Sequence, residues 1–250
     1  MMRIAVVVAV VLVAAAVPLA AQDGAYAVVA VKDGGSVAGR VLFSGKVPAP
    51  EILPVISDRD ACGEDKPSRA LVVAADGGVE NAVIKLVGIR RGKGWGEREY
   101  ALGQTDCRFE PHVLLLPKGA DLRLLNHDRI AHNVRTYGRG PVFNVGQPKF
   151  VEKLLVENFS EQVSHPEVVR VGCDIHPWMS AYIVVMEHPY YAVTDERGAF
   201  RLAEVPPGEY HLALWHETLG ESSRKIAVRP GEETEVTFRL SRPRPAAGGR

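Results

Sequence analysis

The chain has 250 residues, of which 46% are hydrophobic and 24% charged, an ordinary composition that allows one large domain or two small ones. Its 30 basic and 30 acidic residues cancel, so no overall field attracts the chain to nucleic acid or to an anionic membrane. The composition therefore excludes a globally disordered chain, and nucleic acid is not an expected partner.

Residues 1–21 have the pattern of a secretory signal peptide. Arg3 gives a positive start, the run Ile4–Val17 is almost wholly Ala and Val, and small residues precede Gln22. This run of about fourteen residues is short for a bilayer span, which needs roughly twenty. We expect cleavage, export to the periplasm or the cell surface, and no stable membrane span afterwards. An uncleaved anchor is the alternative.

From Ser36 onward the chain has an all-β rhythm, in which short runs rich in Val, Leu, Ile, Tyr and Phe alternate with Gly and Pro turns. The expected strands are 36–43, 70–74, 81–87, 112–116, 121–125, 168–171, 182–187 and 210–215. Residues 149–157 fit either a strand or a short helix. The tail 242–250, rich in Pro, Arg, Ala and Gly, is expected to be disordered because it has little to bury.

The three cysteines need separate explanations in an exported protein, where disulfides persist. Cys62 and Cys107 lie in segments without metal-ligand spacing, and we expect them to form a disulfide. Two unrelated buried thiols are the alternative. Cys173 is then left over, and an unpaired cysteine in this setting indicates a metal or a reactive role.

A cluster of metal-binding side chains surrounds this third cysteine. Cys173, His176 and Met179 follow one another at three-residue spacing, and His132 lies some forty residues earlier, after the polar turn 126–128. Thiolate, imidazole and thioether together suit copper, because soft sulfur favours the reduced ion and imidazole accepts both oxidation states. The short loop can turn three donors towards one point.

Two motifs in this region resemble the cupredoxins, the amicyanin and plastocyanin branch in particular. The first covers 109–134 and includes Asn126-x-Asp128 and His132-Asn133-Val134, and the second is Cys173-x-x-His176-Pro177-x-Met179. The resemblance implies a Greek-key β-sandwich with one type 1 (blue) copper ion. The ligands it implies are His132 and His176 through nitrogen, Cys173 as the equatorial thiolate and Met179 as the long axial donor.

The same resemblance implies roles for three neighbours of these ligands. Asn133 would lie beside the centre, with its backbone N–H reaching the Cys173 sulfur. Pro177 and Trp178 either pack in the core or form an apolar rim around His176 where redox partners dock. The remaining histidines receive no metal role; His127 and His112 are expected to be structural, and the sequence Trp215-His216-Glu217 is only noted as unusual.

The C-terminal block resembles a second family, the carboxypeptidase regulatory-like (transthyretin-like) β-sandwich. The motifs are Thr-Asp-x-x-Gly-x-Phe-x-Leu at 194–202 and Pro-Gly-x-Tyr at 207–210. That family's opening strands resemble 39–41 and 81–83, which precede the copper-binding block. This smaller sandwich is therefore either interrupted by the cupredoxin-like block or follows it in series.

These patterns predict an ordered set of segments. They are a signal peptide 1–21, an N-terminal β segment 22–95 that could be the first half of the regulatory-like sandwich, a cupredoxin-like copper domain 96–188, a regulatory-like segment 189–241, and a disordered tail 242–250.

The expected function is transfer of single electrons in the cell envelope to or from redox partner proteins. An enzyme is not expected, because four protein donors leave no open position on the metal and no His-x-His pair supplies further copper ligands. The alternatives are a non-redox binding or structural module, with a carbohydrate or protein partner, and a protein for copper storage or delivery.

Overall fold

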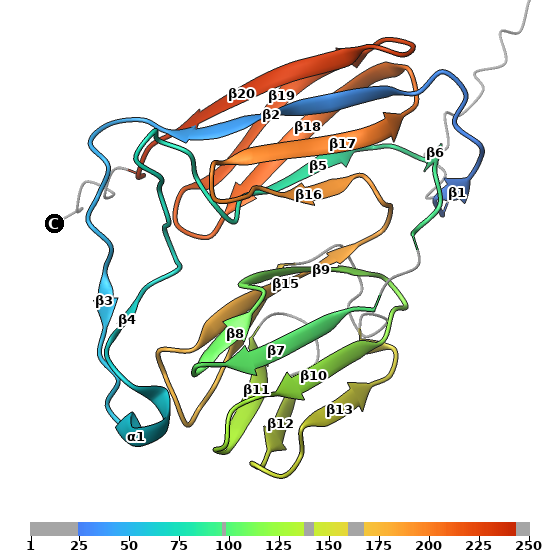
Figure 1. The fold of residues 1–250 in the computed structure, drawn as a ribbon. Helices are drawn as coiled ribbons and strands as arrows, with labels where there is room; N and C mark the ends of the chain where they lie inside the picture. Colours follow the sequence, from blue (N-terminus) through green and yellow to red (C-terminus); the bar gives the residue numbers. More distant parts are fainter. Residues whose placement is uncertain (1–24, 97–98, 138–142, 160–167, 244–250) are drawn as a thin grey trace, which may run out of the picture.

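The computed structural model of the protein describes residues 25–96, 99–137, 143–159 and 168–243 (Figure 1). The expected signal peptide lies outside the described residues, as does His165, and so does the tail beyond Pro243. Within these ranges, no helix combines the length and the apolar character that a membrane span requires.

The fold is all-β, as the sequence predicts, with one four-residue helix, α1 (Arg59–Cys62), among the described residues. The strands before residue 100 are β1 (Ala27–Val28), β2 (Gly35–Phe43), β3 (Ile52–Leu53), β4 (Lys66–Pro67), β5 (Val83–Val87) and β6 (Arg91–Gly92). The middle strands are β7 (Ala101–Thr105), β8 (Arg108–Glu110), β9 (Val113–Pro117), β10 (Leu122–Asn126), β11 (His132–Tyr137), β12 (Asn144–Gln147), β13 (Lys153–Val156), β14 (Val168–Gly172) and β15 (Ser180–Met186). The last strands are β16 (Tyr191–Val193), β17 (Ala199–Val205), β18 (Gly208–His216), β19 (Gly220–Val228) and β20 (Glu233–Leu240).

One expected strand is absent from the structure, and one segment whose type the sequence left open contains a strand. The strand predicted over 70–74 is wrong, because the tight turn at Gly77 reverses the chain so soon that Val73 forms only a single bridge with Val79. The ambiguous segment 149–157 contains the strand β13.

The middle strands form one sandwich, which we call the inserted sandwich. Its two sheets have the strand orders β13-β10-β7-β8 and β12-β11-β14-β15-β9. Fully buried side chains such as Leu102, Leu124 and Ile183 come from both sheets and meet in one hydrophobic cluster. The alternation of buried and partly buried residues along β10 is typical of a strand with one face in such a core.

The strands on either side of this segment form a second sandwich, the flanking sandwich. Its sheets have the orders β16-β5-β18-β19 and β17-β2-β20, so strands from before and after the inserted sandwich hydrogen-bond together. Strand β2 pairs in parallel with β20 and antiparallel with β17. This sandwich is therefore discontinuous in sequence, and a second cluster that includes Val41, Ile84 and Leu214 forms its core.

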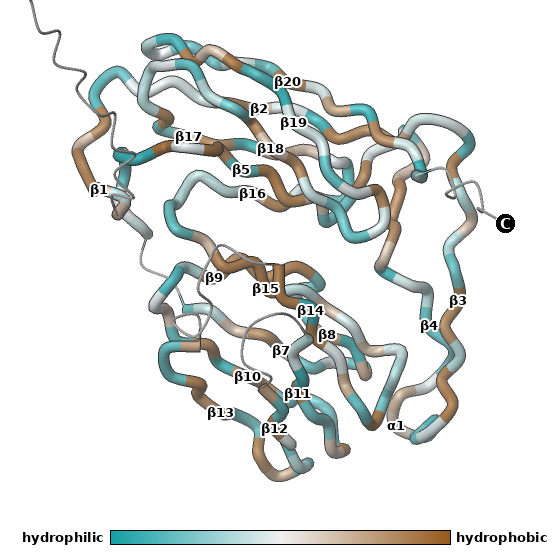
Figure 2. The backbone as a smooth tube through the Cα atoms, turned by 180° about the vertical axis from the view of Figure 1, so that it is seen from behind, coloured by the Kyte–Doolittle hydropathy of each residue, from teal (hydrophilic) through white to brown (hydrophobic). Residues whose placement is uncertain are grey.

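Strands β9 and β15 are buried on both faces because they lie between the two cores. Figure 2 shows both strands as hydrophobic along most of their length. Ile183 points into the core of the inserted sandwich, whereas Val184 packs with Val83 of β5 and Val113 of β9. This third cluster joins the two sandwiches.

An extension of the flanking half reaches the inserted sandwich. It comprises residues Ile52–Pro67, that is β3, α1 and β4, and we call it the arm. In Figures 1 and 2 the arm runs from the flanking sandwich along one side of the inserted sandwich. Val55 of the arm is fully buried in the core of the inserted sandwich, and Cys62 forms a disulfide with Cys107 there.

Candidate metal centre

The loop that carries the predicted ligands connects two neighbouring antiparallel strands. Cys173 directly follows β14 and Met179 directly precedes β15. Within the loop, the backbone N–H of Met179 donates to the carbonyl of His176 at 2.9 Å, which closes a tight turn. The turn directs His176 back towards Cys173, and both side chains are buried.

His132 reaches the same place from the adjacent strand. It is the first residue of β11, and Arg135 of β11 pairs with Gly172 of β14, so the start of β11 runs alongside the ligand loop. The turn before it is held by Asn126, which accepts from the backbone N–H of Asp128 and donates to the carbonyl of Ile130. This Asx turn fixes the entry of the chain into β11.

Three of the four predicted ligands come together. Nδ1 of His132 lies 2.9 Å from Nδ1 of His176, and Nδ1 of His176 lies 3.8 Å from the Cys173 sulfur. All three donor atoms lie within 4.8 Å of one another. Donors about 2.0–2.3 Å from one metal, at tetrahedral to trigonal angles, lie about 3.3–3.8 Å apart, so small movements would let these three bind a single ion.

The second ring nitrogen of each imidazole, Nε2, is hydrogen-bonded to a carboxylate. Nε2 of His132 lies 2.9 Å from Asp128, and Nε2 of His176 lies 3.0 Å from Asp58 of the arm. Partners of this kind select the tautomer and orient the ring, and they raise the basicity of the opposite nitrogen. Both Nδ1 atoms are therefore prepared as donors towards a common point.

The charge distribution favours a thiolate at Cys173. Burial raises the pKa of this thiol, but hydrogen bonds from His132 and from the backbone N–H groups of Asn133, His176 and Ile175 outweigh burial and lower it. Thiolate is the form that binds metals. Asn133 lies beside Cys173, and its side-chain oxygen accepts a hydrogen bond from the protonated form of the thiol, with 3.2 Å between oxygen and sulfur.

His132 carries the complementary charge. Burial alone would lower its pKa, but hydrogen bonds and charges from Asp128 and Cys173 outweigh burial and raise the pKa to about 9. The pKa of Asp128 is lowered: burial raises it, but hydrogen bonds from His132 and from the backbone N–H groups of Cys107 and Asp106 prevail. The raised pKa of His132 and the lowered pKa of Cys173 therefore have a common cause, because the charged form of each side chain stabilises that of the other.

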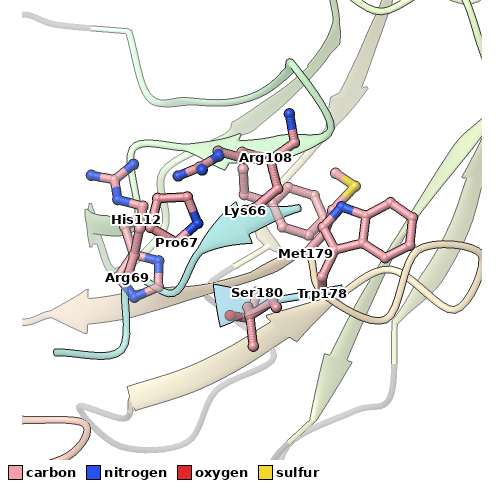
Figure 3. A pocket seen from close by; sticks show the side chains of 10 residues that line it. Lys66, Pro67, Arg69, Arg108, His112, Trp178, Met179 and Ser180 are labelled. Atoms are coloured by element: carbon pink, nitrogen blue, oxygen red, sulfur yellow. The ribbon is translucent and has the colours of Figure 1, made fainter. Parts of the chain in front are cut away.

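Met179 is buried on the same loop. It lines a small pocket together with Trp178, Phe109 and His112, and Figure 3 shows it beside the indole of Trp178. The structure thus assembles two imidazoles and one thiolate. Met179 as an axial ligand remains an expectation from the motif.

The disulfide and the free cysteine are divided as the sequence suggests. Cys62 and Cys107 are bonded, and Cys173 is the free, buried cysteine. Cys107 and the preceding Asp106 both have positive φ angles, a two-residue turn between β7 and β8 that brings this disulfide beside Asp128.

Trp178 packs in the core and does not form an exposed rim. Only 8% of its surface is exposed, its indole N–H donates to the carbonyl of Cys107, and its ring lies 5.0 Å from that of His176. Pro177 is exposed, but His176 itself is fully buried beneath the arm. Of the two residues predicted for an apolar rim, Trp178 thus belongs to the core, whereas Pro177 lies at the surface next to the exposed Ile175.

The other described histidines lie outside the group of donors. His127 is exposed. His112 is buried and its Nε2 contacts the carboxylate of Glu217, which links the two sandwiches. His216, next to Glu217, is buried too, and its Nδ1 accepts from the backbone N–H of Thr218 at 3.1 Å. These contacts are structural, as expected for His112.

Comparison with known proteins identifies the C-terminal part of the chain. The model of the carboxypeptidase regulatory-like domain family matches residues 176–241, which confirms that resemblance for about a quarter of the chain. The match begins at His176 and ends just after β20. No curated protein matches the chain.

Several solved structures of copper proteins share a weak similarity with the chain. The Cu-containing nitrite reductase from Thermus scotoductus SA-01 is 21% identical over 38% of this chain, which spans only 24% of that enzyme, with a TM-score of 0.31. The purple cupredoxin from Nitrosopumilus maritimus is 18% identical over 35% of this chain and all of its own (TM-score 0.29). Amicyanin from Paracoccus versutus is 15% identical over 48% of this chain and 93% of its own (TM-score 0.30). These values are too low to transfer a function, so the centre has to be judged on its own donors.

Sequence reasoning missed the two carboxylates that hold the imidazoles. Asp128 stands in the Asn-x-Asp turn four residues before His132, so a search for outer partners near the motif could have found it. Asp58 lies 118 residues before His176, and no local spacing connects them.

Proposed function

We propose that this chain binds one copper ion through His132, Cys173 and His176, with Met179 as a weak fourth donor, and that it carries single electrons. The observation that carries the proposal is the buried group of two Nδ1 atoms and one thiolate sulfur that face one another. A mixed set of imidazole and soft sulfur donors suits copper in both oxidation states.

The residues around the donors support a preorganised centre. Asp128 and Asp58 hold the two rings through Nε2, and backbone N–H groups stabilise the thiolate of Cys173. Copper bound there would supply one-electron redox chemistry between Cu(I) and Cu(II). The rigid strands β11, β14 and β15 position the donors, so little rearrangement would accompany a change of charge.

We further propose that the protein acts outside the cytoplasm, in the periplasm or on the cell surface, with redox proteins of the cell envelope as partners. The pattern of residues 1–21 supports export, and the Cys62–Cys107 disulfide suits an oxidising compartment. No catalytic step is assigned to the centre, since four protein donors would leave no open position for a substrate.

The test is the visible and EPR spectrum of the mature chain after addition of Cu(II), compared with Cys173→Ser. An intense thiolate-to-copper band that is lost in Cys173→Ser and bleached reversibly by a reductant is expected. His127→Ala, which removes an exposed histidine near the centre, is the matched control and should keep the band. A colourless product, or one independent of Cys173, would contradict the copper assignment and favour a non-redox binding module.

A further inference from the structure

The imidazole of His176 is separated from solvent by a carboxylate of the arm. Oδ2 of Asp58 lies 3.0 Å from Nε2 of His176. The side chain of Asp58 is 48% exposed, whereas that of His176 is fully buried. The half-exposed carboxylate is therefore the group that occupies the outer edge of this ring.

The backbone at Asp58 is shaped for this contact and not for helix capping. Asp58 directly precedes α1, where an aspartate usually accepts hydrogen bonds from the first turn, yet its side chain makes no such bond. Its φ of 50° and ψ of 35° lie in the left-handed region, which is costly for residues other than glycine and best tolerated by Asn and Asp. The strained conformation directs the carboxylate to His176.

Several contacts hold the arm against the inserted sandwich and so fix Asp58. Cys62, at the end of α1, is bonded to Cys107. The buried Lys66 forms an ion pair with Asp106 at 2.8 Å, and Val55 is fully buried in the core. Figure 3 shows Lys66 and the neighbouring Pro67 on β4, beside the pocket that contains Trp178.

We propose that Asp58 is a positioning residue of the metal centre, an inference that rests on the proposed function. By accepting the hydrogen on Nε2 of His176, its carboxylate fixes the tautomer in which Nδ1 is free to bind and raises the basicity of Nδ1. Its negative charge also favours the more positive oxidation state of a bound ion. Loss of Asp58 therefore weakens Cu(II) binding more than Cu(I) binding and raises the reduction potential.

The experiment uses two variants of the mature chain that tolerate a positive φ. Asp58→Asn removes the charge but keeps an acceptor oxygen, and Asp58→Gly removes the side chain. Asp60→Asn is the matched control, because Asp60 is an exposed acid of the same helix and its loss changes the net charge equally. Circular dichroism and a count of one free thiol verify that each variant folds with its disulfide formed.

Affinities for Cu(I) and Cu(II) are measured by competition with chelators, and the reduction potential by voltammetry. We expect Cu(II) affinity to fall about 10-fold in Asp58→Asn and up to about 100-fold in Asp58→Gly, with a rise in potential and no change in Asp60→Asn. In the metal-free protein, the Nε2–H proton of His176 should give an NMR signal that exchange with water removes in Asp58→Gly alone.

Equal Cu(II) affinities and an unchanged Nε2–H signal in all three variants would overturn the role of Asp58. So would a loss of affinity in Asp60→Asn as large as that in Asp58→Asn, because the effect would then belong to net charge. If the unmodified chain binds no copper, the proposed function itself fails, and this inference fails with it.

Discussion

A buried histidine remote from the metal centre makes the stability of the protein depend on pH. His188 lies between β15 and β16, and its ring packs against those of Tyr26, Tyr190 and Tyr191 with centroids 4.9–6.1 Å away. Its Nδ1 accepts from the backbone N–H of Tyr190 at 3.3 Å. Burial, and to a lesser degree the charge of Lys85, lower the pKa of His188 to about 4.

The size of the effect follows from proton linkage. In the unfolded chain His188 binds a proton as the pH falls below 6.5, whereas in the folded chain it binds one only as the pH falls to about 4. Stability is therefore fully present above pH 6.5 and is lost as the pH falls from there to about 4. The loss from His188 is about 2 kcal/mol at pH 5 and about 3 kcal/mol at pH 4.

Urea unfolding at pH 7 and pH 5, for the unmodified chain and for His188→Asn, measures this contribution. Asparagine does not titrate, and its side-chain oxygen can accept the bond that Nδ1 of His188 accepts. Between the two pH values the unmodified chain should lose about 2 kcal/mol more than the variant. His216, whose pKa burial also lowers, is present in both proteins, so its effect cancels. An equal loss in both, or an NMR titration of His188 with a midpoint above pH 6, would refute the reasoning.

Three further predictions concern the metal centre and its supports. Replacing Cys62 and Cys107 by alanine should cost about 4 kcal/mol in urea unfolding, the loop entropy for a sequence separation of 45, and a loss under 1 kcal/mol would contradict this. Asp128→Asn should weaken copper binding at least about 10-fold in chelator competition, because a neutral acceptor replaces the charged one at Nε2 of His132; unchanged affinity would argue against the contact. Met179→Leu should keep the thiolate-to-copper band but change the reduction potential in voltammetry, and an unchanged potential would exclude Met179 as a donor.

The parts of this protein that could be read from its sequence are those with local signals. Alternating hydrophobic residues and Gly or Pro turns reveal the strands, and the spacing of Cys173, His176 and Met179 marks the ligand loop. The Asx turn before His132 is likewise recognisable from Asn126 and Asp128, because its hydrogen bonds join residues two to four apart.

The features that could not be read depend on contacts between distant parts of the chain. From the sequence alone, Trp178 could lie in an exposed rim or in the core. The choice depends on the arm, which covers this part of the inserted sandwich. The contact of Asp58 with His176 spans 118 residues, and no pattern in either segment specifies the other. The failed strand at 70–74 has a local cause instead, since its residues are apolar enough for a strand but the reversal at Gly77 leaves Val73 only a single bridge with Val79.

The discontinuity of the flanking sandwich gives that sandwich a part in the metal centre. The arm connects β2 with β5, which belong to the two different sheets of the flanking sandwich, so both ends of the arm are anchored in that sandwich. The Cys62–Cys107 disulfide attaches the middle of the arm to the inserted sandwich. The contact of His112 with Glu217 and the cluster around Val83 and Val184 also join the two sandwiches. Because Asp58 comes from the flanking half and His132, Cys173 and His176 from the inserted half, the full set of donors and supports exists only when both sandwiches are folded and docked. A separated 96–188 segment would keep the three donors but lose the disulfide and the carboxylate that orients His176.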